Sequence, residues 1–266
     1  MLKKITVSTL AKRRADGEKL VMSTAYDAVE ARLCAAAGID FLLVGDSVGM
    51  THLGYANTLP VTMEEMLMHA AAVRRGAPEA FVVFDMPFMS YQESEALALH
   101  NAGLALKSVG ADAVKLEGGA ECAPLVRRMT AAGIPVMAHV GLMPQHVQVA
   151  GGYKVVGRDE DSAERVLADA LAMQEAGAFA VVLECVPEAL ARRVTETVDI
   201  ATIGIGSGRD CSGQVQVICD LLGLGEFTPR HAKRYLEGGP LIAAALKQYA
   251  DEVREGTFPA PENSFR

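Results

Sequence analysis

Four short apolar runs in this chain each end on an acidic residue. They are Phe41–Asp46, Phe81–Asp85, Ala113–Glu117 and Ala180–Glu184. A short run of β-forming residues that closes on an acid is typical of a buried parallel strand whose C-terminal end opens into a site. Four such ends predict carboxylates that converge at one end of a sheet or barrel, where a divalent metal and a general base can both be housed.

The pattern around these runs is a repeated alternation of helices and strands. An alanine-rich helix end is followed by a glycine and then by β-forming residues, as at Gly38, Gly110, Gly133 and Gly177. Glycine suits the left-handed position just past a helix, so these segments predict helix-to-strand junctions. We expect strands at residues 20–25, 40–46, 80–85, 112–117, 135–139, 179–184, 201–205 and, with a helix as the alternative, 214–220. We expect helices at residues 8–14, 27–37, 62–75, 93–109, 121–132, 161–176, 187–197 and 229–254.

Eight strand–helix units predict an α/β protein, with residues 1–266 forming a single (β/α)8 barrel domain. A doubly wound open sheet is the alternative.

The net charge of −8, with no long basic block, argues against nucleic acid or an anionic membrane as a partner. The five cysteines show no Cys-x-x-Cys spacing, which indicates reduced thiols in a cytoplasmic protein. The first residues lack an apolar stretch, so neither a signal peptide nor a membrane span is expected.

Asp46 and Asp85 end neighbouring predicted strands, and two adjacent carboxylates repel each other unless a cation lies between them or one is protonated. A hard divalent ion with oxygen ligands, Mg²⁺ by preference, resolves this repulsion. Each acid alone is also a plausible N-cap of the following helix. Together with Glu117, which Gly118 and Gly119 follow, the pair favours a metal site.

Lys115 and Glu117 lie two residues apart on one predicted strand, so both side chains point to the same face. A lysine inside a barrel needs a partner. Lys115 is therefore expected to balance the acids, bind a substrate carboxylate or form a Schiff base. A purely structural Lys115–Glu117 pair is the alternative.

Two further residues at strand ends could act on a substrate. Glu184 is flanked by apolar residues that would strip it of water, which suits a base that takes a proton from carbon beside a carbonyl. The alternative is an N-cap of the helix that begins near Pro187. His139 could donate a hydrogen bond to a substrate oxygen, or it could be structural.

The glycine-rich segment 203–208 resembles a phosphate-binding loop, but no dinucleotide or P-loop motif accompanies it.

These residues also carry a family resemblance, which runs in order from about residue 5 to the segment Asn263–Phe265. The chain resembles the ketopantoate hydroxymethyltransferase family. The stretches that carry the resemblance are Thr24–Asp27, Val44–Met50, Thr58–Thr62, Ala71–Pro78, Asp85–Phe88, Val114–Gly119, His139–Leu142, Gly151–Lys154, Leu183–Pro187 and Ile203–Gly206.

The resemblance implies a (β/α)8 barrel of the phosphoenolpyruvate-binding superfamily, assembled as a homodecamer. It implies transfer of a one-carbon unit from the co-substrate 5,10-methylenetetrahydrofolate to 3-methyl-2-oxobutanoate, giving ketopantoate for pantothenate and coenzyme A synthesis. A carbon–carbon lyase of the same superfamily and a non-catalytic metabolite-binding barrel are the alternatives.

The resemblance also implies residue roles. Asp46 and Asp85 would bind one Mg²⁺ directly and so contribute to keto-acid binding, and Glu117 would complete the metal site through water. Ser47 and Lys115 would hold the keto acid, where we also expect His139. Glu184 would be the catalytic base.

Overall fold

The computed structural model describes residues 5–265, and the chain divides after Val217 into two compact units. The first unit contains a closed barrel of parallel strands in sequential order, β1 to β8. The open-sheet alternative is wrong, because β8 pairs with β1 and closes the sheet. The assignment of all 266 residues to one barrel domain stays a prediction. The strands are β1 (Leu20–Thr24), β2 (Phe41–Val44), β3 (Phe81–Asp85), β4 (Ala113–Glu117), β5 (Val136–Gly141), β6 (Ala180–Glu184), β7 (Ala201–Ile205) and β8 (Gly213–Gln216).

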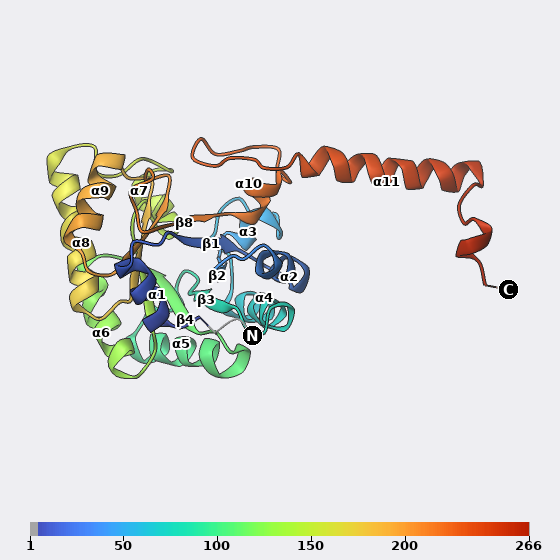
Figure 1. Ribbon diagram of the computed structural model, residues 1–266. Helices are drawn as coiled ribbons and strands as arrows, with labels where there is room; N and C mark the ends of the chain where they lie inside the picture. Colours follow the sequence, from blue (N-terminus) through green and yellow to red (C-terminus); the bar gives the residue numbers. More distant parts are fainter. Residues whose placement is uncertain (1–4, 266) are drawn as a thin grey trace. The chain divides into compact units, whose positions relative to one another are not determined.

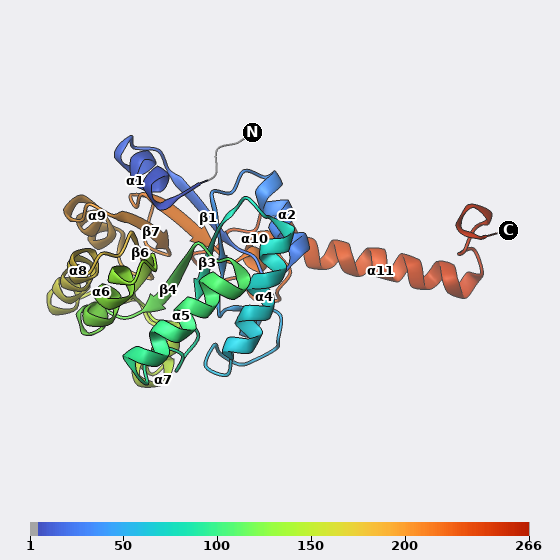
Figure 2. The same cartoon turned by 90° about the horizontal axis from the view of Figure 1, so that it is seen from below.

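Helices surround these strands, as Figures 1 and 2 show for the first unit. Its helices are α1 (Val7–Ala15), α2 (Ala28–Ala36), α3 (Val48–Thr51), α4 (Met63–Gly76), α5 (Glu95–Val109), α6 (Ala123–Ala131), α7 (Val147–Ala150), α8 (Glu160–Glu175) and α9 (Glu188–Thr197), with 3₁₀ turns η1 (Ala120–Cys122) and η2 (Pro144–His146). The second unit contains α10 (Ile218–Leu222), α11 (Gly238–Glu255) and η3 (Pro261–Asn263). No helix in the described part of the chain is long and apolar enough to cross a membrane.

Local sequence signals set several helix boundaries. Asp27 accepts from the backbone N–H groups of the first turn of α2, and Thr62 and Glu65 form a reciprocal capping box at the start of α4. Gly110 ends α5 in the left-handed conformation, at φ 70°. These caps satisfy backbone groups that a helix end otherwise leaves unpaired, which explains why the predicted starts of α2 and α4 are confirmed to within a residue.

Two predicted elements differ from the structure. The segment expected to form the strand or helix 214–220 forms both: β8 ends at Gln216, and α10 begins at Ile218. The helix expected over 229–254 begins only at Gly238. An uninterrupted helix would have placed Pro240 in its interior, where a proline lacks the N–H and clashes with the preceding turn. In the structure Pro240 lies in the first turn of α11, which tolerates it.

The barrel interior is filled by every second residue of the strands. Phe81 and Val83 of β3, Met137 of β5 and Val182 of β6 belong to one buried cluster, and Leu10 of α1 joins it. Because side chains alternate between the two faces of a strand, the next interior positions toward the C-terminal end are Asp85, His139 and Glu184. The packed core therefore determines which side chains reach the open end.

We predict that Gly141→Ala is more destabilising than Gly133→Ala. Both glycines have positive φ, +95° and +85°, so both substitutions carry a backbone penalty of about 1–2 kcal/mol. A Cβ on Gly141 would also lie 2.4 Å from the backbone oxygen of Glu184, whereas a Cβ on Gly133 would meet nothing within 4 Å. Crowding of this kind costs about 1–3 kcal/mol more. Urea unfolding of both variants measures the difference, and equal losses would contradict it.

Candidate active site

Strand register brings Asp85 and Lys115 together. The two residues are paired neighbours on β3 and β4, and Lys115 Nζ lies 2.6 Å from Asp85 Oδ1. Both side chains are almost fully buried. Burial by itself lowers the pKa of Lys115, but the carboxylates of Asp85, Glu117 and Asp46 reverse this effect and raise it above its ordinary value. Lys115 is therefore a charged ammonium inside the barrel end.

Asp46 lies two residues beyond the end of β2 and joins this pair. Its backbone N–H donates to Asp85 Oδ2 at 3.2 Å, and its own Oδ2 accepts from Gln145 Nε2 at 2.9 Å. Burial, reinforced by the neighbouring Asp85 carboxylate, raises the pKa of Asp46 to about 7, although Lys115 acts in the opposite direction. Without a metal ion beside it, the Asp46 carboxyl is therefore partly protonated at neutral pH.

Glu117 is the third buried acid, and it lies opposite His139 in the β4–β5 register. Its Oε2 accepts from the backbone N–H of Gln145 at 2.9 Å. Its Oε1 lies 3.6 Å from His139 Nδ1 and has no hydrogen-bond partner among residues 5–265. Burial raises the pKa of Glu117 well above its ordinary value, with Asp46 and Asp85 adding to the effect and Lys115 opposing it.

Glu184 lies on the other side of His139. Its Oε2 is 3.3 Å from His139 Nε2, and its side chain keeps 16% of its surface exposed, compared with 2% for His139. Burial, together with the charge of Lys115, lowers the pKa of His139 although Glu184 opposes this shift. His139 is therefore a neutral imidazole with a single N–H, placed between two carboxylates.

None of the predicted acids serves as a helix cap. The residue at the N-cap of α3 is Ser47, that of α5 is Ser94 and that of α9 is Pro187. The capping alternative for Asp46, Asp85 and Glu184 is therefore wrong. The structural Lys115–Glu117 pair is also not observed as a salt bridge, because Lys115 contacts Asp85 instead.

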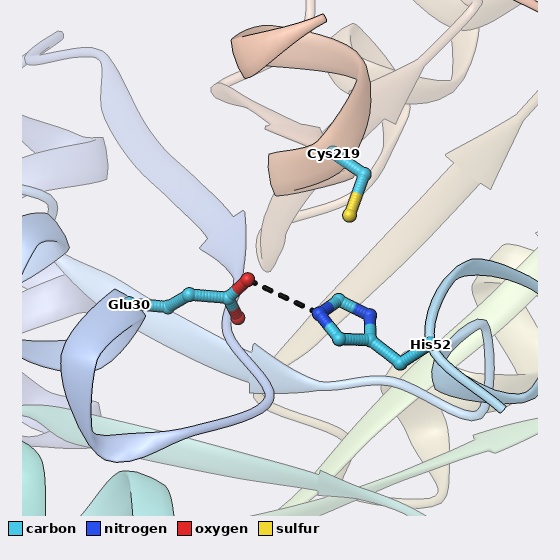
Figure 3. A group of neighbouring side chains, drawn as sticks. All are labelled: Glu30, His52 and Cys219. Carbon is cyan, nitrogen blue, oxygen red and sulfur yellow. Dashed lines mark ion pairs between the residues drawn. The ribbon is translucent and has the colours of Figure 1, made fainter. Parts of the chain in front are cut away.

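Ser47 lies beside this cluster in sequence and is held by a buried tyrosine. Tyr26 Oη and Ser47 Oγ are 2.8 Å apart. Glu30 accepts from the Tyr26 backbone N–H at 2.8 Å and forms an ion pair with His52 at 3.3 Å, which Figure 3 shows. The His52 ring in turn packs on the Tyr26 ring at 4.7 Å. These contacts fix the tyrosine that orients the Ser47 hydroxyl.

The glycine-rich segment 203–208, which begins within β7, makes a hydrogen bond to the end of β6. Ser207 Oγ donates to the backbone oxygen of Leu183 at 2.7 Å, and both atoms are buried. This bond ties the segment 203–208 to the end of β6, one residue before Glu184. The loop therefore supports the strand end that carries Glu184.

The charges of the cluster fit one divalent cation. Asp46, Asp85 and Glu117 carry three negative charges when ionised, and Lys115 supplies one positive charge, which leaves two in excess. Glu117 Oε1 has no hydrogen-bond partner among the described residues, and burial raises the pKa of Asp46, so both groups would be stabilised by a cation beside them. Carboxylate oxygens are the ligands that Mg²⁺ prefers, so the donor set suits it.

Sequence reasoning missed two residues of the site. Gln145 and Tyr91 are buried and contact the acids or their backbones. Both lie in loops after strands, where no hydrophobic period marks which side chain turns inward. The only available signal was that each loop follows a barrel strand, β5 for Gln145 and β3 for Tyr91.

Solved structures with a similar fold support the barrel architecture. A phosphonopyruvate hydrolase complex with oxalate and Mg²⁺ has a TM-score of 0.64 at 12% identity, covering 97% of this chain and 93% of that one. A phosphoenolpyruvate phosphomutase from Streptomyces platensis has a TM-score of 0.63 at 15% identity, covering 97% and 92%. The likeness confirms the fold, a closed α/β barrel of parallel strands.

Comparison with sequences is more specific. The family model for ketopantoate hydroxymethyltransferase matches residues 4–261. The 3-methyl-2-oxobutanoate hydroxymethyltransferase of Trichlorobacter lovleyi is 55% identical over the whole of both chains, and that of Thermus thermophilus is 56% identical over 95% of this chain and 97% of its own. The chain belongs to the ketopantoate hydroxymethyltransferase family.

The activity of the chain is that of a methylenetetrahydrofolate-dependent 3-methyl-2-oxobutanoate hydroxymethyltransferase, which catalyses a step of pantothenate biosynthesis. The predicted family and transferase activity are confirmed. The two alternative functions, a carbon–carbon lyase and a non-catalytic metabolite-binding barrel, are therefore rejected.

We predict that Asp46→Asn gains stability relative to the unsubstituted protein as pH rises, when both are kept in EDTA. The pKa of Asp46 is raised from its ordinary value of 3.8 to about 7 in the folded state, so its contribution to stability is full below about pH 4 and is lost as pH rises through 7. Asparagine does not titrate. Thermal unfolding at pH 5 and pH 8 should show a larger advantage of the variant at pH 8, and a pH-independent difference would contradict this.

Proposed function

We propose that Asp46 and Asp85 bind one Mg²⁺ directly and that Glu117 completes the site through water. The excess of two negative charges and the unsatisfied Glu117 Oε1 support this ligand set. A phosphonopyruvate hydrolase of the same fold was crystallised with oxalate and Mg²⁺, so this fold is compatible with binding of that ion. When bound, the ion supplies positive charge to the keto and carboxylate oxygens of the substrate.

The keto acid is held by Ser47, Lys115 and His139, with Asp46 and Asp85 contributing through the metal site. Lys115 brings a fixed ammonium into a buried environment, where its attraction for an anionic substrate is stronger than in water. The Ser47 hydroxyl, oriented by Tyr26, supplies a hydrogen bond. The neutral His139 has one N–H to donate to a substrate oxygen.

Glu184 is the base that removes the proton from C3 of 3-methyl-2-oxobutanoate. The electron pair of the C–H bond moves onto the keto oxygen, where Lys115 stabilises the negative charge. That pair then forms the bond from C3 to the methylene carbon. Both bonds from this carbon to folate nitrogens break in the course of the reaction, one water supplies the hydroxyl oxygen, and the two nitrogens take up the C3 proton and one proton of that water. Of the four predicted acids, Glu184 is the one with an exposed edge, so it can reach a substrate carbon and return its proton to solvent.

The observation that carries this proposal is the separation of roles across His139. On one side lie the buried acids that surround Lys115, and on the other lies Glu184, 3.3 Å from Nε2. A substrate anchored by the buried group therefore presents a neighbouring carbon toward a carboxylate that does not belong to that group.

We predict that Glu184→Gln abolishes deuterium exchange at C3 of 3-methyl-2-oxobutanoate while the keto acid still binds. The amide keeps the shape of the side chain but cannot accept the proton. Proton NMR in D₂O with Mg²⁺ measures the exchange, and calorimetry measures the binding. A loss of at least about 100-fold is expected for removal of a general base.

Glu196→Gln is the matched control, because it makes the same change of residue type at an exposed position near the C-terminal end of α9. This variant should exchange at the unsubstituted rate. Exchange that persists in Glu184→Gln would remove Glu184 from the base role, and absence of exchange in the unsubstituted protein would remove the proposed reaction step itself.

We also propose that the chain is a cytoplasmic homo-oligomer, a decamer as the family resemblance implies. Helix α11 supports association, because it exposes a row of apolar side chains on one stripe: Ile242, Leu246, Tyr249 and Val253. Such an exposed row on a single helix is typical of a surface that a partner covers. None of the five cysteines, all within the described residues, forms a disulfide, which agrees with a reducing compartment. Light scattering on the full chain tests the assembly, and a monomer mass would contradict it.

A further inference from the structure

Gln145 is the most highly connected side chain at the barrel end, although it carries no charge. It lies on η2, directly after β5, and only 2% of its surface is exposed. Its amide nitrogen donates to Asp46 Oδ2 and to the backbone oxygen of Met86, both at 2.9 Å. Its two N–H groups are therefore used on a carboxylate after β2 and on the backbone just after Asp85.

The oxygen of the same amide is equally occupied. Gln145 Oε1 accepts from Tyr91 Oη at 2.8 Å and from Gln92 Nε2 at 3.2 Å. Tyr91 Oη in turn accepts from the Glu117 backbone N–H at 3.1 Å. All donors face acceptors in this arrangement. Turning the amide over would place its oxygen against the Asp46 carboxylate and the Met86 backbone oxygen, and its nitrogen against Gln92 Nε2, so the amide has one orientation.

The backbone of Gln145 reaches a second acid. Its N–H donates to Glu117 Oε2 at 2.9 Å. A single residue from the β5 loop thus fixes one oxygen of Asp46 and one oxygen of Glu117, which come from different strands. The other oxygen of Glu117 has no hydrogen bond among the described residues, so it is left for another partner.

We propose that Gln145 is a positioning residue that presets the Asp46 and Glu117 carboxylates to receive the divalent cation. This inference rests on the proposed metal site. A neutral amide suits the task, because it holds a carboxylate by hydrogen bonds without cancelling the charge that the cation needs, whereas a lysine or arginine would compete with the cation. Carboxylates that are already fixed lose less freedom on binding, and such outer contacts commonly change metal affinity.

The test compares Gln145→Met with Gln148→Met, using Mn²⁺ alone as the probe. Methionine keeps the length of the side chain and removes its hydrogen bonds, and Gln148 is an exposed residue of the same type on α7. Electron paramagnetic resonance of free Mn²⁺ gives the dissociation constant. Gln145→Met should bind Mn²⁺ about 10- to 100-fold more weakly, as is typical for loss of an outer-shell contact. Gln148→Met should bind as the unsubstituted protein does.

Thermal unfolding with and without Mn²⁺ distinguishes a positioning role of Gln145 from a purely structural one. A ligand that binds the folded state raises the melting temperature according to its affinity. If Gln145 only supports the fold, the variant should melt lower in EDTA but keep the full Mn²⁺-dependent rise. If Gln145 positions the ligands, that rise should shrink. An unchanged dissociation constant in Gln145→Met would overturn the inference.

Tyr91→Phe keeps the inference testable if Gln145→Met does not fold. This variant removes only the hydroxyl that anchors Gln145 Oε1, so Mn²⁺ affinity should fall several-fold, and unchanged affinity would overturn the inference. Failure of the proposed metal site looks different, because the unsubstituted protein itself would then bind no Mn²⁺.

Discussion

The charge balance at the C-terminal end of the barrel is the constraint on which the rest of the site depends. Three carboxylates and one ammonium are almost completely removed from water there. Ionised groups in such a place must be paired or must take up protons. Burial raises the pKa values of Asp46 and Glu117, and the neighbouring carboxylates add to the effect, so both acids resist ionisation here. A divalent cation would remove the cost of that ionisation, and this is the physical basis of the metal site that we propose at this barrel end.

This constraint also reconciles an acidic protein with anionic substrates. The net charge is −8, yet the local field at the site depends on Lys115 and on the cation that the carboxylates would hold. Strand register positions both parts of the site. Because β3, β4, β5 and β6 are consecutive neighbours, their interior positions place Asp85 beside Lys115 and Glu117 beside His139. In the proposed reaction one further acid, Glu184 at the end of β6, serves as the base.

Much of this arrangement could be predicted from the sequence, for a clear physical reason. Buried parallel strands are continuous apolar runs, so the acids that end β3, β4 and β6 are visible as breaks in those runs. The pairing of Asp85 with Lys115 was not predicted, because register depends on packing between strands and not on either strand alone. Gln145 and Tyr91 were missed because their loops carry no periodic pattern, and their inward orientation comes from hydrogen bonds made only in the folded chain. The late start of α11 follows from Pro240, a local signal that the predicted helix did not take into account.

The most direct test of the account is the position of a bound metal ion in a crystal of the full chain. Crystals soaked with Mn²⁺ and 3-methyl-2-oxobutanoate would give an anomalous difference map that locates the ion without assumptions about the protein. The account predicts one strong peak per chain in contact with the carboxylates of Asp46 and Asp85, with Glu117 oriented toward it and the keto acid beside it. A peak at another place, or a bound keto acid with no peak near these carboxylates, would contradict the central claim.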